Sequence, residues 1–66
     1  MSRKLIRLQK VIDKTGKCRS SIYADMAEGK FPKQVSLGAR SVAWDDTEID
    51  LWIEGKISER DDRAVL

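Results

Sequence analysis

The sequence predicts a mainly α-helical domain with a small β-hairpin, arranged as a winged helix-turn-helix of three short helices plus a wing. Three observations support this class. Two short helical patterns meet at a glycine-containing turn, as in a helix-turn-helix. Alternating apolar residues then flank a second turn, as in a β-hairpin. An acidic helix start follows the hairpin directly and predicts the third helix.

The first helix is predicted from its apolar periodicity. Leu5 and Ile6 lie between basic residues and are compatible with a short strand or with the lead-in to a helix. From there apolar positions recur at helical spacing, and Gly16 supplies the stop, because glycine tolerates the left-handed conformation that closes many helices. The periodic positions are Leu8, Val11, Ile12 and Thr15.

The second helix should begin near Arg19 and end before Gly29. Its apolar face is formed by Ile22, Tyr23 and Met26, with Ala27 closing it. Phe31-Pro32 then marks a turn, because proline disfavours helix at the preceding residue. The hairpin follows, with apolar residues alternating on either side of Gly38-Ala39-Arg40, namely Val35, Leu37, Val42 and Trp44.

The third helix is predicted to start at Asp45, which forms a capping-box pattern with Glu48. Its buried stripe should contain Ile49, Trp52 and Ile53, extend to Ile57, and leave Leu51 pointing away. Beyond it, charges outnumber apolar residues. We therefore expect one winged helix-turn-helix domain over residues 1–57 and a flexible charged tail over residues 58–66.

Charge is divided unevenly along the 66 residues. Residues 1–44 hold ten basic against three acidic side chains, a net charge of +7, whereas residues 45–66 hold three against eight, a net charge of −5. This asymmetry indicates one surface for a polyanion, against the simpler alternative of ordinary solvated faces. One cysteine and no histidine exclude an intramolecular disulfide and a zinc finger. No cofactor or metal is expected, and no apolar stretch is long enough for a membrane span.

The candidate DNA-binding residues lie around the turn, the second helix and the hairpin. Arg19 begins the recognition helix of a helix-turn-helix and could clamp phosphate or bind guanine. Arg40, between small residues, would reach a minor groove from the hairpin tip, although a solubilising turn residue is an equal alternative. The full predicted set is Lys17, Arg19, Ser20, Ser21, Tyr23, Lys30, Lys33, Arg40 and Ser41.

Several side chains have simpler explanations than a binding or catalytic role. Trp44 and Trp52 could stack on single-stranded bases, but a small domain needs them for its core. Cys18 lies beside Lys17 and Arg19, which could lower its thiol pKa, yet a substitute for a helix-capping residue explains it more simply. Without a catalytic constellation, an enzyme is not expected.

An ordered set of motifs is similar to the AlpA family of prophage regulators, relatives of excisionases and MerR-like winged helix-turn-helix proteins. The resemblance covers residues 5–54. It implies that the second helix enters the major groove and that the hairpin wing reaches a minor groove. Cys18, where the family often has serine, and Ala24, where a long basic residue is frequent, depart from the pattern. The matching motifs are Arg7-Leu8, Thr15-Gly16, Arg19-Ser20-Ser21-Ile22-Tyr23, Gly29-Lys30-Phe31-Pro32, Gly38-x-Arg40-x-Val42-x-Trp44 and Glu48-Ile49-Asp50-x-Trp52-Ile53.

We therefore expect a cytoplasmic, nucleoid-associated transcription regulator of prophage or mobile-element type that binds double-stranded DNA. Further copies on adjacent sites are expected as partners, because one small domain makes few base contacts. An integrase is a further candidate partner, since relatives of this family direct excision by an integrase. Two alternatives stay open. One is an excisionase that bends attachment-site DNA, and the other is an inhibitor that uses the same fold to bind a protein.

Overall fold

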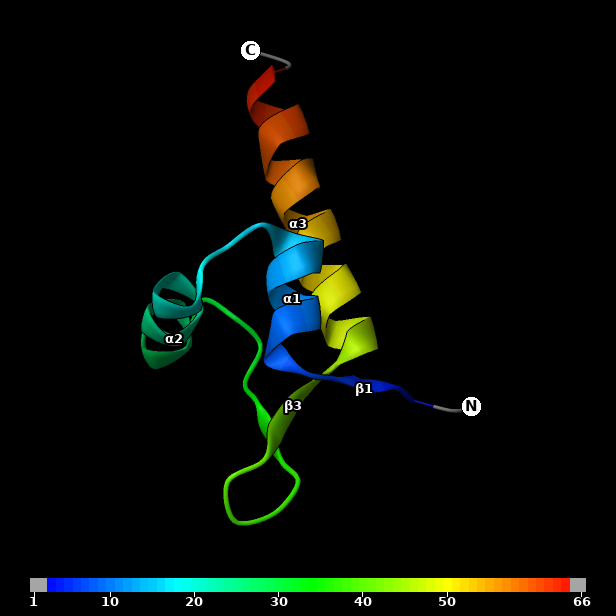
Figure 1. The fold of residues 1–66 in the computed structure, drawn as a ribbon. Coiled ribbons are helices and arrows are strands. Elements are labelled where there is room, and N and C mark those ends of the chain that lie inside the picture. The colour runs from blue at the N-terminus through cyan, green and yellow to red at the C-terminus, as the bar shows by residue number, and fades with distance from the viewer. Residues whose placement is uncertain (1–2, 65–66) are drawn as a thin grey trace.

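The structure, a computed structural model, describes residues 3–64 and contains three helices and three short strands within that range. Figure 1 shows α1 beside α3, α2 to the left of α1, and the hairpin that contains β3 extending below the helices. The mainly helical winged helix-turn-helix predicted from the sequence is confirmed. The elements are β1 (Leu5–Ile6), α1 (Leu8–Thr15), α2 (Arg19–Ala27), β2 (Val35–Ser36), β3 (Val42–Asp45) and α3 (Asp46–Ala64).

The turn between α1 and α2 forms as its glycine predicts. Gly16 has a φ of 74°, and its N–H donates to the Ile12 carbonyl at 2.8 Å. Cys18 is the N-cap residue of α2, but its side chain makes no capping hydrogen bond. Its sulfur instead lies 3.3 Å from the Ser21 hydroxyl. The expectation that Cys18 caps the helix is therefore correct for its position and wrong for its side chain.

The end of α2 is closed by a Schellman motif centred on Gly29. Gly29 has a φ of 73°, and its N–H donates to the Met26 carbonyl at 3.1 Å. The next N–H, of Lys30, reaches back to the Asp25 carbonyl at 2.8 Å. These two bonds satisfy carbonyls that the helix leaves unpaired and turn the chain toward the core.

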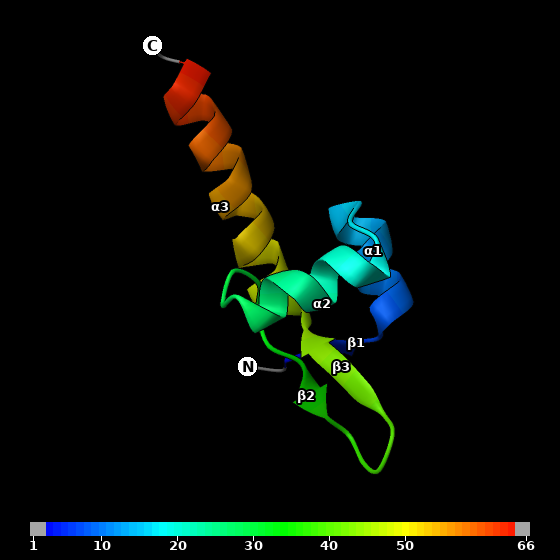
Figure 2. The ribbon, with the colours of Figure 1, turned by 90° about the vertical axis from the view of Figure 1, so that its left-hand side faces the viewer.

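The three strands form one antiparallel sheet in the order β1-β3-β2. Leu5 pairs with Asp45 and Ile6 with Trp44, so the ambiguous start of the chain is a strand. The predicted hairpin is confirmed, with Val35 opposite Ala43 (Figure 2). The Leu37 N–H donates to the Ser41 carbonyl at 2.7 Å and closes the hairpin tip.

Asp45 ends β3 and caps α3. Its carboxylate accepts a 2.9 Å hydrogen bond from the Thr47 N–H and forms an ion pair with Arg3, while only 4% of the residue is exposed. This is the Asp45 half of the predicted capping box, and Glu48 itself is exposed. The cap fixes the angle between the sheet and the helix that follows.

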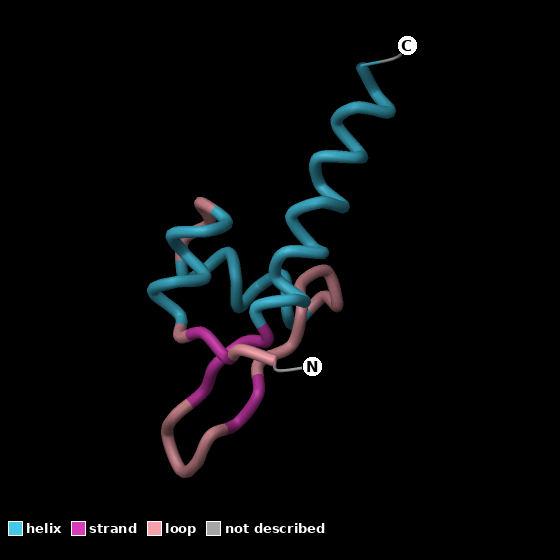
Figure 3. Tube along the Cα trace, turned by 90° about the vertical axis from the view of Figure 1, so that its right-hand side faces the viewer, coloured by secondary structure: helices cyan, strands magenta, loops and turns pink. Residues whose placement is uncertain are grey.

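The helix α3 is longer than predicted. It continues to Ala64, where the sequence predicts a flexible tail from Ser58, and Figure 3 shows it extending past the other elements. Charged residues with long side chains are good helix formers, so a high charge content does not by itself end a helix. An ion pair between Lys56 and Glu59 at 3.3 Å adds local support. Residues 65–66 lie outside the described range, and the domain boundary at residue 57 stays a prediction.

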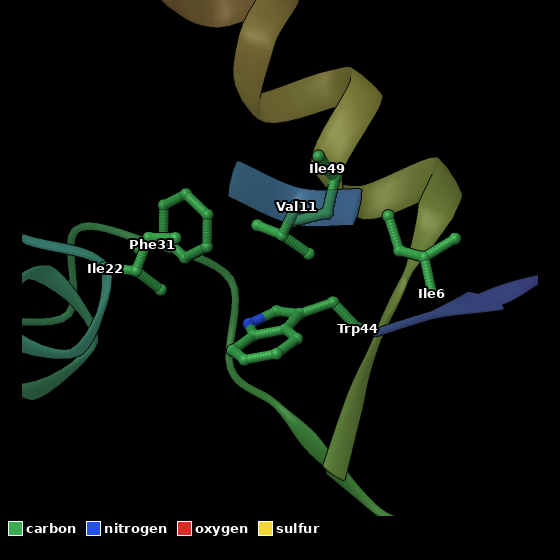
Figure 4. Packing of buried hydrophobic residues seen from close by; sticks show 6 residues of the cluster. All are labelled: Ile6, Val11, Ile22, Phe31, Trp44 and Ile49. Atoms are coloured by element: carbon green, nitrogen blue, oxygen red, sulfur yellow. The ribbon is translucent and has the colours of Figure 1, made fainter. Parts of the chain in front are cut away.

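The core is small and centred on Trp44, which is fully buried. Figure 4 shows the side chains of α1, α2, α3 and the sheet converging on it. Ile57 is 45% exposed, so its predicted place in the buried stripe is wrong, because α3 has passed the core by that point. Leu51, 61% exposed, points away as predicted. The buried cluster comprises Ile6, Val11, Ile22, Phe31, Trp44 and Ile49.

Both tryptophans hold the loop between α2 and β2. The Trp44 indole N–H donates to the Pro32 carbonyl at 3.1 Å, and that of Trp52 donates to the Lys30 carbonyl at 2.9 Å. Phe31 packs edge-on against Trp52 with ring centroids 4.9 Å apart. The loop is therefore fixed by two hydrogen bonds and one buried ring, which confirms that the tryptophans serve the core.

Lys14 joins α1 to α3. Its ammonium pairs with Asp46 and, at 2.6 Å, with Asp50. The hydrogen bond with Asp46, and then that with Asp50, raises the pKa of Lys14, and the bond from Lys14 lowers the pKa of Asp46. The first turn of α3 is thus tied to the last turn of α1 by charge.

Trp44→Phe tests the tether to Pro32. It leaves a carbonyl unpaired and a void in the core, so the free energy of unfolding should fall by about 2 kcal/mol or more. Trp52→Phe is the matched control, because its indole hydrogen bond is exposed and its loss should cost about 1 kcal/mol or less. Urea denaturation followed by far-UV circular dichroism measures both. Equal decreases in the free energy of unfolding would show that the hydrogen bond from Trp44 to Pro32 contributes no more to stability than the exposed one from Trp52.

Asp46→Asn tests the link between α1 and α3. Because the folded-state pKa of Asp46 is lowered, its ionised form contributes stability above the unfolded-state pKa of about 4, and that contribution disappears as the pH falls through the folded-state value. The variant should therefore be less stable than the parent at neutral pH, and the two melting temperatures should converge in acid. Glu54→Gln, on the exposed part of α3, is the control. A difference that is independent of pH would contradict the ion-pair account.

Candidate nucleic-acid interface

An open hollow of about 400 Å³ lies between the start of α1, α2 and β3. These three elements border the same face of the molecule in Figure 2. Arginines from three separate parts of the chain meet there. The lining residues are Arg7, Leu8, Gln9, Arg19, Tyr23, Arg40 and Val42.

Arg19 and Tyr23 lie one turn apart on α2. The Arg19 guanidinium carbon is 5.8 Å from the centroid of the Tyr23 ring, within cation–π range. The same ring packs against the core, and its centroid lies 6.4 Å from that of Trp44 in an edge-on arrangement. Packing of the Tyr23 ring, predicted from the sequence, is confirmed. The ring therefore connects the buried tryptophan to an exposed guanidinium.

Arg40 lies at the tip of the hairpin and is exposed. Although twenty positions separate it from Arg19 in the sequence, both line the same hollow. The short hairpin brings them together, because Val42 pairs with Ser36 and follows the tip directly. The helix start and the wing thus present their cations to one space.

The basic residues fall into two groups by their partners. Among the residues that the structure describes, six form ion pairs with carboxylates: Arg3, Lys14, Lys17, Lys30, Lys56 and Arg60. The three arginines of the hollow form none with any described carboxylate. Three cations without an acidic partner therefore share one hollow, whereas the other lysines that form no ion pair with a described carboxylate, Lys4, Lys10 and Lys33, lie outside its lining.

The three predicted lysines lie outside the hollow. Lys17 pairs with Asp25 at 2.6 Å and lies 5.8 Å from the centroid of the Trp52 ring, and its hydrogen bond lowers the pKa of Asp25. Lys30 pairs with Glu28 at 3.0 Å on the surface, where such pairs are weak. Neither lysine lines the hollow, and Lys33 is exposed outside it.

The predicted serines have different surroundings. Ser20 is exposed in the first turn of α2, and Ser21 is half-buried with its hydroxyl on the Cys18 sulfur. That contact, rather than the neighbouring cations, is the main reason why the pKa of the Cys18 thiol is lowered. Ser41 is half-buried at the base of the tip. Only Ser20 presents its side chain fully to solvent.

Sequence analysis missed Arg7 and Gln9 as members of this surface. Arg7 precedes α1, far from the turn and the wing in the sequence. Its place in the hollow follows from the pairing of β1 with β3, which brings the residue after Ile6 beside the hairpin. The one available signal was the possible strand at Leu5 and Ile6.

The described residues offer no cluster of three or more histidine, cysteine, aspartate or glutamate side chains that could hold a metal. None of their helices combines the length and apolar character needed to cross a membrane.

Comparison with known proteins identifies the family. The model of the prophage CP4-57 regulatory protein (AlpA) family matches residues 4–57. The chain is 39% identical over 56 residues to the DNA-binding transcriptional activator AlpA of Escherichia coli strain K12, covering 76% of this chain and 80% of the relative. It is 40% identical over 57 residues to the uncharacterized protein ORF88 of Enterobacteria phage P4, covering 86% of this chain and 65% of that protein's length. The chain therefore belongs to the AlpA family of prophage regulatory proteins.

Proposed function

We propose that this protein is a DNA-binding transcription regulator that binds a duplex through α2 and the hairpin wing. The observation that carries the proposal is the convergence of Arg19 and Arg40 on one hollow without a carboxylate partner among the described residues. Membership of a family that includes a protein named as a DNA-binding transcriptional activator supports it.

In this proposal α2 enters the major groove. Arg19 is in the first turn of α2, where a recognition helix presents its base-contacting side chains. A guanidinium can bind O6 and N7 of guanine together, which distinguishes this base from the other three. Ser20 is the exposed neighbour, suited to a base edge or a phosphate, and Ser21 supports the helix start through Cys18.

The wing reaches the adjacent minor groove. Arg40 is exposed at the tip between Ala39 and Ser41, so no large side chain obstructs its approach to a narrow groove. A narrow minor groove has an enhanced negative potential that attracts such a guanidinium. Lys33, exposed near β2, is suited to a phosphate contact. Lys17 and Lys30 would first have to leave Asp25 and Glu28, so we assign them secondary contacts.

The proposal involves no catalytic step. Two other functions remain compatible with the same fold, that of an excisionase and that of a protein-binding inhibitor. An excisionase would bend its site, so the mobility of a complex should change as the site is moved along a fragment. An inhibitor would bind a protein and leave DNA only weakly and nonspecifically bound.

Binding of several copies to adjacent sites would give a cooperative titration on a fragment with repeated sites, whereas independent copies would give a simple isotherm.

Arg19→Ala tests the proposed contact of α2 with the major groove, and Arg40→Ala tests that of the wing with the minor groove. The duplex is one enriched by the protein from a random-sequence pool, and affinity is measured by fluorescence anisotropy across a salt series. Arg19→Ala should lower the preference for the selected site about tenfold or more, since one bidentate base contact is lost. Arg40→Ala should weaken binding and flatten the salt dependence.

Arg60→Ala is the control, because it removes the same charge near the far end of α3, where Arg60 pairs with Asp61 at 2.8 Å. It should leave affinity close to that of the parent. Melting temperatures establish that all variants fold. An Arg19→Ala protein that retains both affinity and preference would remove α2 from the interface.

A further inference from the structure

We infer that the hollow is a binding site for the sugar-phosphate strand of the duplex and that Arg7 is its phosphate ligand. This inference rests on the proposed function and assigns a role to a residue that lies on neither the recognition helix nor the wing.

Duplex geometry requires a strand at this position. The major and minor grooves are separated by one sugar-phosphate backbone, so a protein that inserts a helix in one groove and a wing in the next must accommodate that backbone between them. The surface between Arg19 on α2 and Arg40 on the wing is the hollow. The lining residues that lie between these two arginines, Arg7 among them, therefore face phosphates rather than base edges.

The backbone of Arg7 is held at a defined point. The preceding residue, Ile6, is buried and pairs with Trp44 in the sheet. The Arg7 carbonyl accepts a 3.1 Å hydrogen bond from the Val11 N–H, which makes Arg7 the N-cap residue of α1. The side chain is exposed, but it emerges from a backbone fixed by both a strand and a helix.

The chemistry of the hollow suits a phosphodiester. A guanidinium offers paired N–H donors that match two phosphate oxygens. Arg7 has no ion pair with the carboxylates of residues 3–62, and Tyr23 adds an uncharged donor to the lining. The side-chain amide of Gln9, which also lines the hollow, donates to the Asp13 carboxylate at 3.1 Å. Leu8 and Val42 are half-buried and contribute the apolar part. With Arg19 and Arg40 assigned to the two grooves, Arg7 is the cation of the lining that remains for the phosphate between them.

A phosphate ligand has a distinct signature, because every sequence has the same backbone. Its loss should weaken binding to any duplex by the same factor and leave sequence preference unchanged. Loss of a base contact changes that preference. Loss of a structural residue lowers the melting temperature and alters every contact together.

The experiment measures affinity across a salt series for the full chain and for Arg7→Ala, Arg7→Lys and Arg60→Ala, on the selected duplex and on a scrambled one. For Arg7→Ala we expect weaker binding to both duplexes by the same factor. The slope of log affinity against log salt should fall in magnitude by about 0.9, which corresponds to one phosphate contact. Arg7→Lys should keep the slope and lose part of the affinity, and Arg60→Ala should match the parent.

A second measurement does not depend on the folding of a variant. Single phosphates of the selected duplex are replaced in turn by neutral methylphosphonates. For the parent protein we expect loss of affinity at a position between the contacted major and minor grooves, and for Arg7→Ala no further loss at that position. Additive losses at every position would overturn the inference.

The outcomes separate this inference from the proposed function. If the parent binds the selected duplex and Arg19→Ala loses preference, but Arg7→Ala keeps the parental slope, the phosphate site is wrong and the DNA-binding function stands. A loss confined to the selected duplex would make Arg7 a base contact and would also overturn the inference. If the parent binds no duplex, the proposed function itself fails.

Discussion

Burial of Trp44 at the centre of β3 is the constraint on which the rest of this structure depends. The residue pairs with Ile6 of β1, donates its indole N–H to the Pro32 carbonyl and packs edge-on with the Tyr23 ring. Arg7 follows the strand residue that pairs with Trp44, Arg19 stacks on Tyr23, and Arg40 lies in the hairpin that β3 completes. One buried side chain therefore sets the relative positions of all three exposed arginines.

The acidic residues contribute to this arrangement through the basic residues with which they form ion pairs. Asp25 holds Lys17, Asp45 holds Arg3, and Asp46 and Asp50 share Lys14. Each pair ties secondary-structure elements or their connections together and neutralises a cation away from the hollow. The charge asymmetry of the sequence is thus only partly a division between two surfaces. Part of the basic charge is used in these internal ion pairs, and the three arginines without such a pair lie together where α1, α2 and the wing meet.

Much of the fold could be predicted because its signals are local. Helical periodicity places α1, Gly16 and Gly29 end the two helices of the turn, and Asp45 starts α3. The site predictions that failed depended on contacts through space. The possible strand at Leu5 and Ile6 does not say which strand it pairs with, so it does not bring Arg7 to the hollow, and nothing near Lys17 indicates its pair with Asp25. The length of α3 was missed because a high charge content was taken to predict disorder, although these residues favour helix.

The central claim is that the face formed by the start of α1, α2 and the wing holds the duplex, while the extended part of α3 does not. Backbone amide shifts of the isotopically labelled protein, recorded by NMR during titration with the selected duplex, test this most directly. The account predicts that the largest changes fall on Arg7 to Gln9, the first turn of α2 and the hairpin tip, and that residues 54–62 change little. Changes concentrated on α3, with the hairpin tip and the start of α2 unaffected, would contradict it.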